Sequence, residues 1–430
     1  MTVSTRQAQI AYWAQKHPAE ACVSLNHFLD EEWLQEAFRL TRRDGATGVD
    51  GITKQDYEQD LAANLRDLSD RARSGRYKAP PVKRGYVPKG DGEERRPIGM
   101  PAVEDKVLQR GVTMILEPLY EQDFLDCSYG FRPHRSAHDA LETIWQNISR
   151  MGGCWILDVD IRKFFDTLGH QHLREILDQR IRDGVIRRLI DKWLKAGIWE
   201  DGQVSYSEQG TPQGGCISPM LSNIYLHTVL DEWFERTIKP LLRGKAFLVR
   251  FADDFVMGFA EETDARRVLA VLPKRFGKYG LAIHPDKTRL VDFRAPYKTP
   301  GKEPETFQFL GFTHYWGQSR RGTVVLKRKT AKQRVARTLK RLGEWCRRNR
   351  HLPLLFQQRK LNQKLRGHYA YFGITGNFRA LWQVFQRTGR IWYTWLARRT
   401  RGGKGMNWER FASLAKIFPL ALPRIVHSRA

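Results

Sequence analysis

The sequence predicts an α/β protein followed by a separate helical region. Short β-rich runs at residues 154–161, 246–251 and 255–259 lie between segments with the apolar spacing of helices. Beyond residue 322 the chain changes to long basic stretches that also have helical spacing, so we expect the main domain boundary near residue 320. At 430 residues the chain is too long for one simple core, and two or three domains are expected.

The remaining elements follow from local patterns. Residues 1–75 are predicted to be mostly helical, and a loop-and-strand region rich in turn formers comes after them. A helix is expected over 102–116, with Pro118 as its stop. Longer helices are expected over 170–196 and 218–234, where apolar residues again recur at helical spacing.

Composition excludes several classes of protein. Apolar residues make up 41% of the chain and aromatic residues 11%, which argues against global disorder. No apolar run approaches the length of a membrane span, and the N-terminus lacks the basic and apolar regions of a secretory signal. The 5 cysteines are scattered, which predicts a reducing compartment and argues against a disulfide scaffold or structural zinc.

Positive charge is concentrated in the C-terminal quarter of the chain. The formal net charge is +26, from 73 basic and 47 acidic residues. Residues 321–430 contribute +25 of this, with 27 Lys and Arg against Glu344 and Glu409. Because nothing within this segment offsets the repulsion, we expect a polyanionic partner, and the clustering favours nucleic acid. An anionic membrane surface is the minor alternative.

Two adjacent carboxylates, Asp253 and Asp254, interrupt the apolar, strand-like run R-F-A-D-D-F-V-M-G-F. A buried charge needs a partner, a proton or a metal, whereas a wet, acidic hairpin tip is the simpler alternative. In the strand predicted over 154–161, alternation places Asp158 and Asp160 on one face. If the two strand systems are neighbours, three or more carboxylates converge. Such a cluster selects Mg²⁺ or Mn²⁺, and two ions about 3.5–4 Å apart support nucleotidyl transfer.

The motifs around these carboxylates resemble those of group II intron-encoded reverse transcriptase/maturases. F-A-D-D-F is similar to the Y-A-D-D box of reverse transcriptases, and D-V-D-I-R-K-F-F-D resembles their first catalytic block. Further blocks stand in the order that the family uses: R-D-G-A-T-G-V-D-G, V-P-K-G-D-G-E-E-R-R-P-I-G-M-P, S-Y-G-F-R-P-H-R-S-A-H-D-A, G-T-P-Q-G-G-C-I-S-P-M-L-S-N-I, A-I-H-P-D-K-T and F-Q-F-L-G-F. Near the end, L-R-G-H-Y-A-Y-F and N-W-E-R-F resemble the maturase region. The likeness extends over residues 25–430.

The resemblance implies a right-hand polymerase fold. Residues 1–75 would form an N-terminal extension, and residues 76–320 the fingers and a palm with an antiparallel sheet. Residues 321–430 would form an all-helical, basic thumb/maturase domain with a DNA- and RNA-binding tail. Most aromatic residues of that last segment are expected to lie in its core.

The resemblance also assigns the catalytic residues. Asp160, Asp253 and Asp254 would be the catalytic carboxylates, and together with the backbone carbonyl of Ile161 they would bind two Mg²⁺ ions, with Mn²⁺ as a possible substitute. Asp254 is expected to be more peripheral than the other two. Asp158 is expected to be structural, as is Asp166.

Further residues are assigned to the nucleotide and the primer. The residues implied to contact the incoming nucleotide are Lys89, Arg96, Phe165, Gln213 and Lys287. Arg95 is an alternative to Arg96, and Phe164 is expected to be an ordinary core residue beside Phe165, which would exclude a 2′-hydroxyl. Leu310 and Gly311 would position the primer, although a plain β-hairpin is a competing explanation.

Exposed cations of the last segment would contact RNA and DNA: Lys364, Arg366, Arg379, Arg398, Arg399 and Arg401. Two departures from the family pattern are visible. Phe251 replaces the usual Tyr, which leaves metal ligation intact. The chain ends at Ala430 without the H-N-H endonuclease of many relatives. It therefore resembles the endonuclease-lacking, class C-like bacterial subgroup, which would take its DNA primers from elsewhere.

The expected function is an RNA-directed DNA polymerase that copies intron RNA into DNA and assists splicing of its intron, supporting intron mobility. The expected partners are group II intron RNA, an RNA template with a DNA primer, dNTPs and target DNA, with neither a membrane nor a small-molecule cofactor. The expected location is the bacterial cytoplasm, in association with the nucleoid. The alternatives are a splicing-only maturase and a reverse transcriptase that serves a defence or diversity-generating system.

Overall fold

The structure, a computed structural model, describes residues 2–88, 95–206, 209–210, 214–299, 301, 303–319, 321–399 and 406–428. The chain divides into two compact units, Met1–Val291 and Asp292–Ala430. The boundary expected near residue 320 falls inside the second unit, where strands before it pair with strands after it. In addition, the Tyr371 hydroxyl donates to the Leu310 carbonyl at 2.9 Å.

The first unit begins with helices, as the sequence predicted. They are α1 (Val3–Lys16), α2 (Glu31–Leu40), α3 (Lys54–Gln59), α4 (Leu61–Arg73) and α5 (Val103–Tyr120), with the short turn η1 (Asn26–Phe28) before α2. The Asp30 side chain caps α2 by accepting from the Trp33 amide at 2.9 Å. Trp33 is completely buried, and its indole donates to the Gly111 carbonyl of α5 at 2.9 Å, so the first helices pack on α5.

Pro118 does not stop α5, which corrects the prediction. The helix continues to Tyr120 with Pro118 inside it. A proline inside a helix lacks the N–H that would bond the carbonyl four residues earlier, here that of Met114. The Gln7 side chain of α1 donates to this carbonyl at 3.2 Å and takes the place of the missing helical bond.

Two sheets follow. The first sheet has the order β2-β1-β4-β5, formed by β1 (Val82–Pro88), β2 (Arg95–Met100), β4 (Ile198–Glu200) and β5 (Gln203–Ser205). Its β1–β4 pair is parallel, and the other two pairs are antiparallel.

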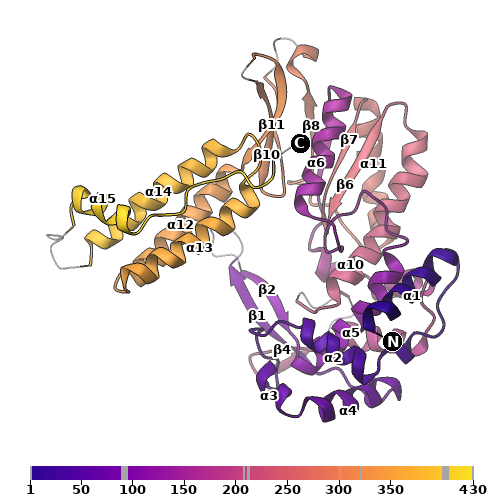
Figure 1. Ribbon diagram of the computed structural model, residues 1–430. Helices are drawn as coiled ribbons and strands as arrows, with labels where there is room; N and C mark the ends of the chain where they lie inside the picture. Colours follow the sequence, from indigo (N-terminus) through magenta and orange to yellow (C-terminus); the bar gives the residue numbers. More distant parts are fainter. Residues whose placement is uncertain are drawn as a thin grey trace. The chain divides into compact units, whose positions relative to one another are not determined.

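The second sheet has the order β6-β7-β3-β8, formed by β3 (Gly153–Asp160), β6 (Ala246–Phe251), β7 (Asp254–Phe259) and β8 (Arg289–Arg294). The strands β3, β6 and β7 are those that the sequence predicted. The helices α6 (Ala137–Met151) and α11 (Glu262–Lys278) pack against them (Figure 1).

The segment expected as one helix over 170–196 forms two helices. They are α8 (His170–Asp178) and α9 (Gly184–Leu194), and the four-residue α7 (Phe164–Thr167) precedes them. The break is at Asp183, whose side chain caps α9 and also accepts from the Leu25 amide at 2.6 Å. The cap therefore depends on a contact with a distant part of the chain, which local periodicity does not report.

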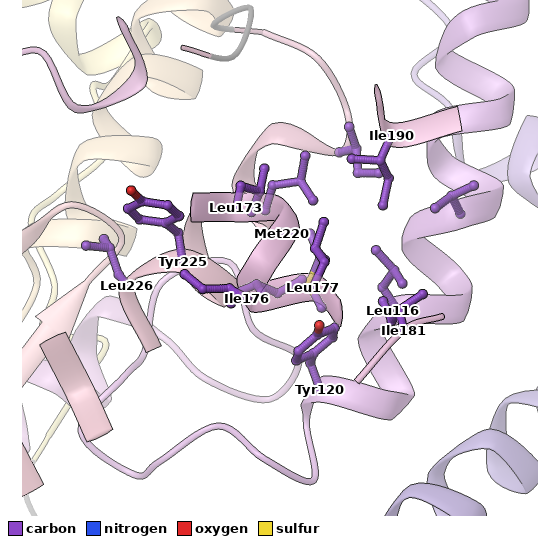
Figure 2. Close-up of a cluster of buried hydrophobic side chains, with 14 of the residues drawn as sticks. Leu116, Tyr120, Leu173, Ile176, Leu177, Ile181, Ile190, Met220, Tyr225 and Leu226 are labelled. Carbon is purple, nitrogen blue, oxygen red and sulfur yellow. The ribbon is translucent and has the colours of Figure 1, made fainter. Parts of the chain in front are cut away.

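The next helix, α10 (Ser218–Leu226), continues as π-helical turns η2 (His227–Asp231) and η3 (Trp233–Ile238) and ends in η4 (Lys239–Leu241). Its buried side chains meet those of α5, α8 and α9 in one hydrophobic cluster (Figure 2). Tyr120 of α5, Ile176 of α8 and Met220 of α10 are among the members that Figure 2 labels. This cluster joins the N-terminal helices to the elements that carry the site.

The second unit combines a small antiparallel sheet with helices. The sheet has the order β11-β10-β9, formed by β9 (Phe307–Phe309), β10 (Phe312–Gln318) and β11 (Val324–Thr330), with η5 (Pro296–Lys298) before it. The helices are α12 (Lys332–Asn349), α13 (Leu354–Phe372), α14 (Phe378–Ala397) and α15 (Trp408–Ile417). The first three lie side by side (Figure 1). The predicted combination of antiparallel sheets with a helical C-terminal region is confirmed, although the strand β11 opens that region. No helix in the described ranges is long and apolar enough to cross a membrane.

Candidate active site

The three predicted catalytic carboxylates come together at one edge of the second sheet. β3 and β7 pair antiparallel, with Asp160 directly opposite Asp254 in the register. Asp253 belongs to the two-residue turn, Ala252–Asp253, between β6 and β7. The strand β3 and the hairpin of β6 and β7 are therefore neighbours in one sheet, a point that the sequence left open.

The three carboxylates differ in exposure. Asp254 is exposed, in agreement with its expected peripheral role, whereas Asp160 and Asp253 are half-buried. Burial raises the pKa of the Asp253 carboxyl, and the Asp160 charge raises it further, while Arg96 and Arg250 lower it. Asp253 adjoins Asp254, which lies opposite Asp160, and its partial burial argues against the wet hairpin tip that was the simpler alternative.

Two cations lie against the carboxylates of β3. Lys287 Nζ is 2.6 Å from Asp160 Oδ2, and the Arg289 guanidinium is 3.3 Å from Asp158 Oδ2. Burial raises the pKa of Asp158, Arg289 opposes this shift, and Asp160 adds to it. Asp158 has its own cationic partner, and this arrangement fits the structural role expected for it.

The backbone at Ile161 is oriented by the segment that follows α11. Arg162 N donates to Ala282 O at 2.8 Å, and His284 N donates to Asp160 O at 2.7 Å. These bonds flank Ile161, so its own carbonyl points away from that segment, as in any non-hydrogen-bonded antiparallel pair. In the sheet, the opposite side of β3 is the side of β7 and the catalytic turn.

The oxygen atoms at this edge suit a hard divalent cation. Two carboxylates and a backbone carbonyl form a donor set that Mg²⁺ accepts when substrate phosphates complete its coordination. In the described part of the chain, no group of three or more His, Cys, Asp or Glu side chains could hold a metal ion by itself. The metal-binding roles of these residues stay predictions.

Phe164 and Phe165 have different surroundings, as the sequence predicted. Phe164 is 2% exposed and belongs to the core, whereas Phe165 is half-buried and meets it edge to face with ring centroids 5.3 Å apart. Phe165 lines a cavity of about 250 Å³ together with Pro97 and Gly99 of β2 and with Gly210. Its contact with a sugar stays a prediction.

Arg96 is an exposed residue of β2, and its charge lowers the pKa of Asp253. A contact of Arg96, or of its alternative Arg95, with a triphosphate stays a prediction. Three other predicted site residues, Lys89, Gln213 and Arg401, lie outside the described residues.

Comparisons with known proteins agree with this geometry. Residues 87–314 match the family described as "Reverse transcriptase (RNA-dependent DNA polymerase)". This range includes all three carboxylates and both sheets of the first unit except the first residues of β1. The chain belongs to the reverse transcriptase family. The right-hand polymerase fold expected from the resemblance follows from this membership, as does RNA-directed DNA polymerase activity.

The relatives of this reverse transcriptase include intron-encoded proteins. "Protein YkfC" of Escherichia coli (strain K12) is 34% identical over 361 residues, which cover 75% of this chain and 91% of that protein. "Group II intron-encoded protein LtrA" of Lactococcus lactis subsp. cremoris is 41% identical over 170 residues, 40% of this chain and 27% of LtrA. "Putative COX1/OXI3 intron 2 protein" of Saccharomyces cerevisiae is 29% identical over 253 residues, 58% of this chain and 27% of that protein. The resemblance to group II intron-encoded reverse transcriptase/maturases is thereby confirmed, whereas the class C-like subgroup stays a prediction. Reverse transcriptases use divalent metal ions.

The predicted primer-positioning residues of the reverse transcriptase form a turn in the second unit. Leu310 and Gly311 connect β9 to β10, with φ of 49° and 80°. The Tyr371 hydroxyl donates to the Leu310 carbonyl at 2.9 Å, and the rings of Phe312 and Tyr371 stack with centroids 5.8 Å apart. The competing explanation, a β-hairpin, describes the local geometry, and a role for the turn at the primer stays a prediction. Sequence reasoning did not connect Tyr371 of L-R-G-H-Y-A-Y-F with this turn.

The predicted nucleic-acid-binding cations of the second unit lie on its surface. Lys364, Arg366, Arg379, Arg398 and Arg399 are all exposed. Arg399 also has a structural task, because its guanidinium donates to the His351 and Leu352 carbonyls after α12.

Not all the aromatic residues between these cations lie in the core. Tyr369 and Trp392 are buried, as expected, but Trp382 is 39% exposed and stacks on the exposed ring of Phe378, with centroids 6.2 Å apart. The helical spacing of these two rings on α14 was visible in the sequence, but it does not show which face of the helix is covered.

Proposed function

We propose that this reverse transcriptase copies group II intron RNA into DNA and also assists the splicing of that intron. The observation that carries the first activity is the pairing of Asp160 with Asp254 across β3 and β7, with Asp253 in the adjoining turn. The cationic second unit and the intron-encoded relatives support the second activity.

The residues of the chain have distinct tasks in this proposal. Asp160, Asp253 and the Ile161 carbonyl hold two Mg²⁺ ions, for which Mn²⁺ can substitute, and Asp254 contributes from the periphery. When bound, the ions supply charge neutralisation and activation of the primer 3′-hydroxyl for in-line nucleotidyl transfer. Lys287, whose Nζ lies 2.6 Å from Asp160 Oδ2, neutralises phosphate charge in this proposal.

The remaining site residues select and orient the substrates. Arg96, with Lys89, grips the triphosphate of a dNTP, and Gln213 contacts the nucleotide and template. Phe165 lies under the sugar and disfavours a 2′-hydroxyl. Leu310 and Gly311 position the DNA primer, and the exposed cations of the second unit bind phosphates of the intron RNA, the template–primer duplex and target DNA. A protein with this charge is expected to associate with the nucleoid in a bacterial cytoplasm.

Primer extension tests the polymerase activity. The full chain is incubated with an RNA template, a DNA primer, dNTPs and Mg²⁺, beside the double variant Asp253→Asn/Asp254→Asn. Long cDNA is expected from the wild type and none from the double variant, because amide groups do not replace anionic metal ligands. Asp201→Asn is the matched control, since it makes the same chemical change at an exposed turn and should leave extension intact.

Splicing is tested separately with the same variants. Intron RNA is incubated at a Mg²⁺ concentration at which it does not splice unaided. The wild type and the double variant are both expected to restore splicing, because the substituted carboxylates are not part of the basic surface. RNA binding and splicing without any cDNA, even from the wild type, would favour the splicing-only maturase. cDNA synthesis without splicing would favour a reverse transcriptase of a different system.

A further inference from the structure

A buried ion pair lies directly behind the catalytic turn. Arg250, in β6, and Asp231, at the end of the π-helical turn η2, are both completely buried. Arg250 Nε donates to Asp231 Oδ1 at 2.8 Å, and its Nη2 donates to Asp231 Oδ2 at 2.5 Å. Removing two charges from water is costly, so a pair in a hydrophobic strand contributes little stability relative to apolar residues. Stability alone therefore does not explain why this ion pair is buried behind the turn.

The remaining guanidinium nitrogen of Arg250 reaches the turn itself. Nη1 donates to the Ala252 carbonyl at 3.0 Å and to Asn223 Oδ1 at 2.9 Å. The Asn223 amide in turn donates to the Gly130 carbonyl at 2.7 Å. One side chain thus connects the turn to α10, where Asn223 lies, and to the loop that contains Gly130 before α6.

The turn requires such support because its backbone is strained. Ala252 has a φ of 60°, in the left-handed region that residues with a Cβ rarely adopt. The loop before α6 also lies so close to the turn that a Cβ added at Gly130 would be 2.3 Å from the Ala252 nitrogen. Backbone bonds from Arg250 N to Cys127 O (2.8 Å) and from Tyr129 N to Arg250 O (2.9 Å) hold this loop against β6.

We propose that Arg250, fixed by Asp231 and Asn223, is a positioning residue for the polymerase reaction. It holds the Ala252–Asp253 turn in its left-handed conformation, and thereby keeps the Asp253 carboxylate beside Asp160. The proposal rests on the proposed polymerase function. The hydrogen bond from Arg250 Nη1 to the Ala252 carbonyl is not needed by an ion pair that only stabilises the core.

Single-nucleotide incorporation tests this role. Asn223→Ala removes the bridge to Gly130 and keeps the ion pair, and Asp231→Asn removes the charge that orients Arg250. Each variant is expected to incorporate a dNTP roughly 10²-fold more slowly, the loss associated with a misplacement of about 1 Å. Affinity for the template–primer duplex is expected to be unchanged, because the contacts to the duplex are not altered. If the Asp231→Asn variant does not fold, the Asn223→Ala variant still tests the role of Arg250.

A substitution at Ala252, the strained residue, distinguishes a positioning role from a general loss of stability. Ala252→Gly removes the conformational penalty at φ 60°, so the turn then depends less on the Arg250 bond. The loss of rate caused by Asn223→Ala is therefore expected to be much smaller in the Ala252→Gly background than in the wild-type background. A slow Asn223→Ala enzyme that Ala252→Gly does not rescue would overturn the proposal.

A second ion pair in the same unit, between buried Arg180 and half-buried Asp123, is the control. Arg180 binds Asp123 at 2.8 Å and also the His17 and Glu20 carbonyls, none of which belongs to the turn. Asp123→Asn is expected to lower the melting temperature as Asp231→Asn does, with an unchanged rate. An equal loss of rate in both variants, or none in either, would overturn the positioning role. Failure of the proposed function is distinguishable, because the wild type itself would then make no cDNA.

Discussion

Asp105 is a carboxyl group that is completely buried in α5, away from the catalytic turn. It accepts hydrogen bonds from the Tyr77 hydroxyl and, at 2.8 Å, from the Trp193 indole. Burial raises the pKa of this carboxyl from 3.8 to about 6, and the two hydrogen bonds oppose the shift. The folded protein therefore favours the protonated form more strongly than the unfolded chain does.

The stability of the protein should depend on this proton. A raised pKa contributes stability that is complete below pH 3.8 and is lost as the pH rises through about 6. Asp105→Asn keeps an acceptor for both donors and carries no charge. As the pH rises from 4 to 7, the wild type should therefore lose about 1 to 3 kcal/mol of its free energy of unfolding relative to the variant.

Denaturant unfolding of both proteins at a series of pH values measures this difference. Because other groups titrate equally in both, the difference between the two curves isolates Asp105. Parallel curves across this range would show that the carboxyl stays ionised in the fold.

Single residues also show what the sequence could and could not reveal about the site. Asp253 and Asp254 were conspicuous as charges in an apolar run, and the resemblance gave them a role. Arg250 lies in the same run, and the same physical question applied to it. The sequence contained no signal for its partner, because Asp231 and Asn223 meet it only when α10 packs behind the sheet.

In the helix α5, a side-chain hydrogen bond replaces a helical hydrogen bond that is missing. Pro118 leaves the Met114 carbonyl without its helical donor, and the Gln7 side chain of α1 takes that place at 3.2 Å. We expect Gln7→Ala to lower the free energy of unfolding by about 1 kcal/mol. In a Pro118→Ala background the helix satisfies its own carbonyl, so the same substitution should cost much less.

A double-mutant cycle on thermal or denaturant unfolding measures this coupling between α1 and α5. Equal costs of Gln7→Ala in both backgrounds would show that the side chain stabilises the protein through some other contact.

At the scale of elements, short-range patterns predicted the strands well and the helix ends less well. The strands β3, β6 and β7 were visible as β-rich runs bounded by turn formers or by charge. The ends of α5 and α9 were not, because they depend on side chains from α1 and on backbone near residue 25. Local periodicity contains no information on such partners.

The charge of the whole molecule leads to a prediction about nucleic-acid affinity. Binding of phosphates by Lys and Arg releases counterions, so affinity for a template–primer duplex should fall steeply with salt. For six or more bound phosphates the expected loss is roughly 10³-fold or greater between 50 and 200 mM. Replacing exposed Lys364, Arg366 and Arg379 by Gln should make the slope of log affinity against log salt less steep, by about one for each phosphate that the variant no longer binds.

Fluorescence anisotropy at several salt concentrations measures the slope. Arg266→Gln is the control, because this exposed residue of α11 pairs with Glu262 in the first unit and should leave the slope unchanged. Affinity that does not change with salt would contradict the electrostatic role of the second unit.

The division into units was the part of the architecture that composition predicted least well. The charge changes near residue 320, but β10 and β11 pair across that point, and the structure divides between Val291 and Asp292. Charge composition reports which surface contacts a polyanion, whereas hydrogen bonds and packing decide which residues fold together.

The network around Arg250 has a consequence for chimaeric enzymes. Arg250 binds Asp231 and Asn223, which are 19 and 27 residues away from it in the chain. Asn223 in turn binds Gly130, which is 93 residues away from Asn223. If the segment around one of these residues is exchanged for the counterpart from a diverged relative, the turn loses a partner that the new segment was never selected to provide. The loop around Gly130, the helix from Asn223 to Asp231 and the hairpin from Arg250 should therefore be transplanted as one set, and recombination points are better placed outside all three.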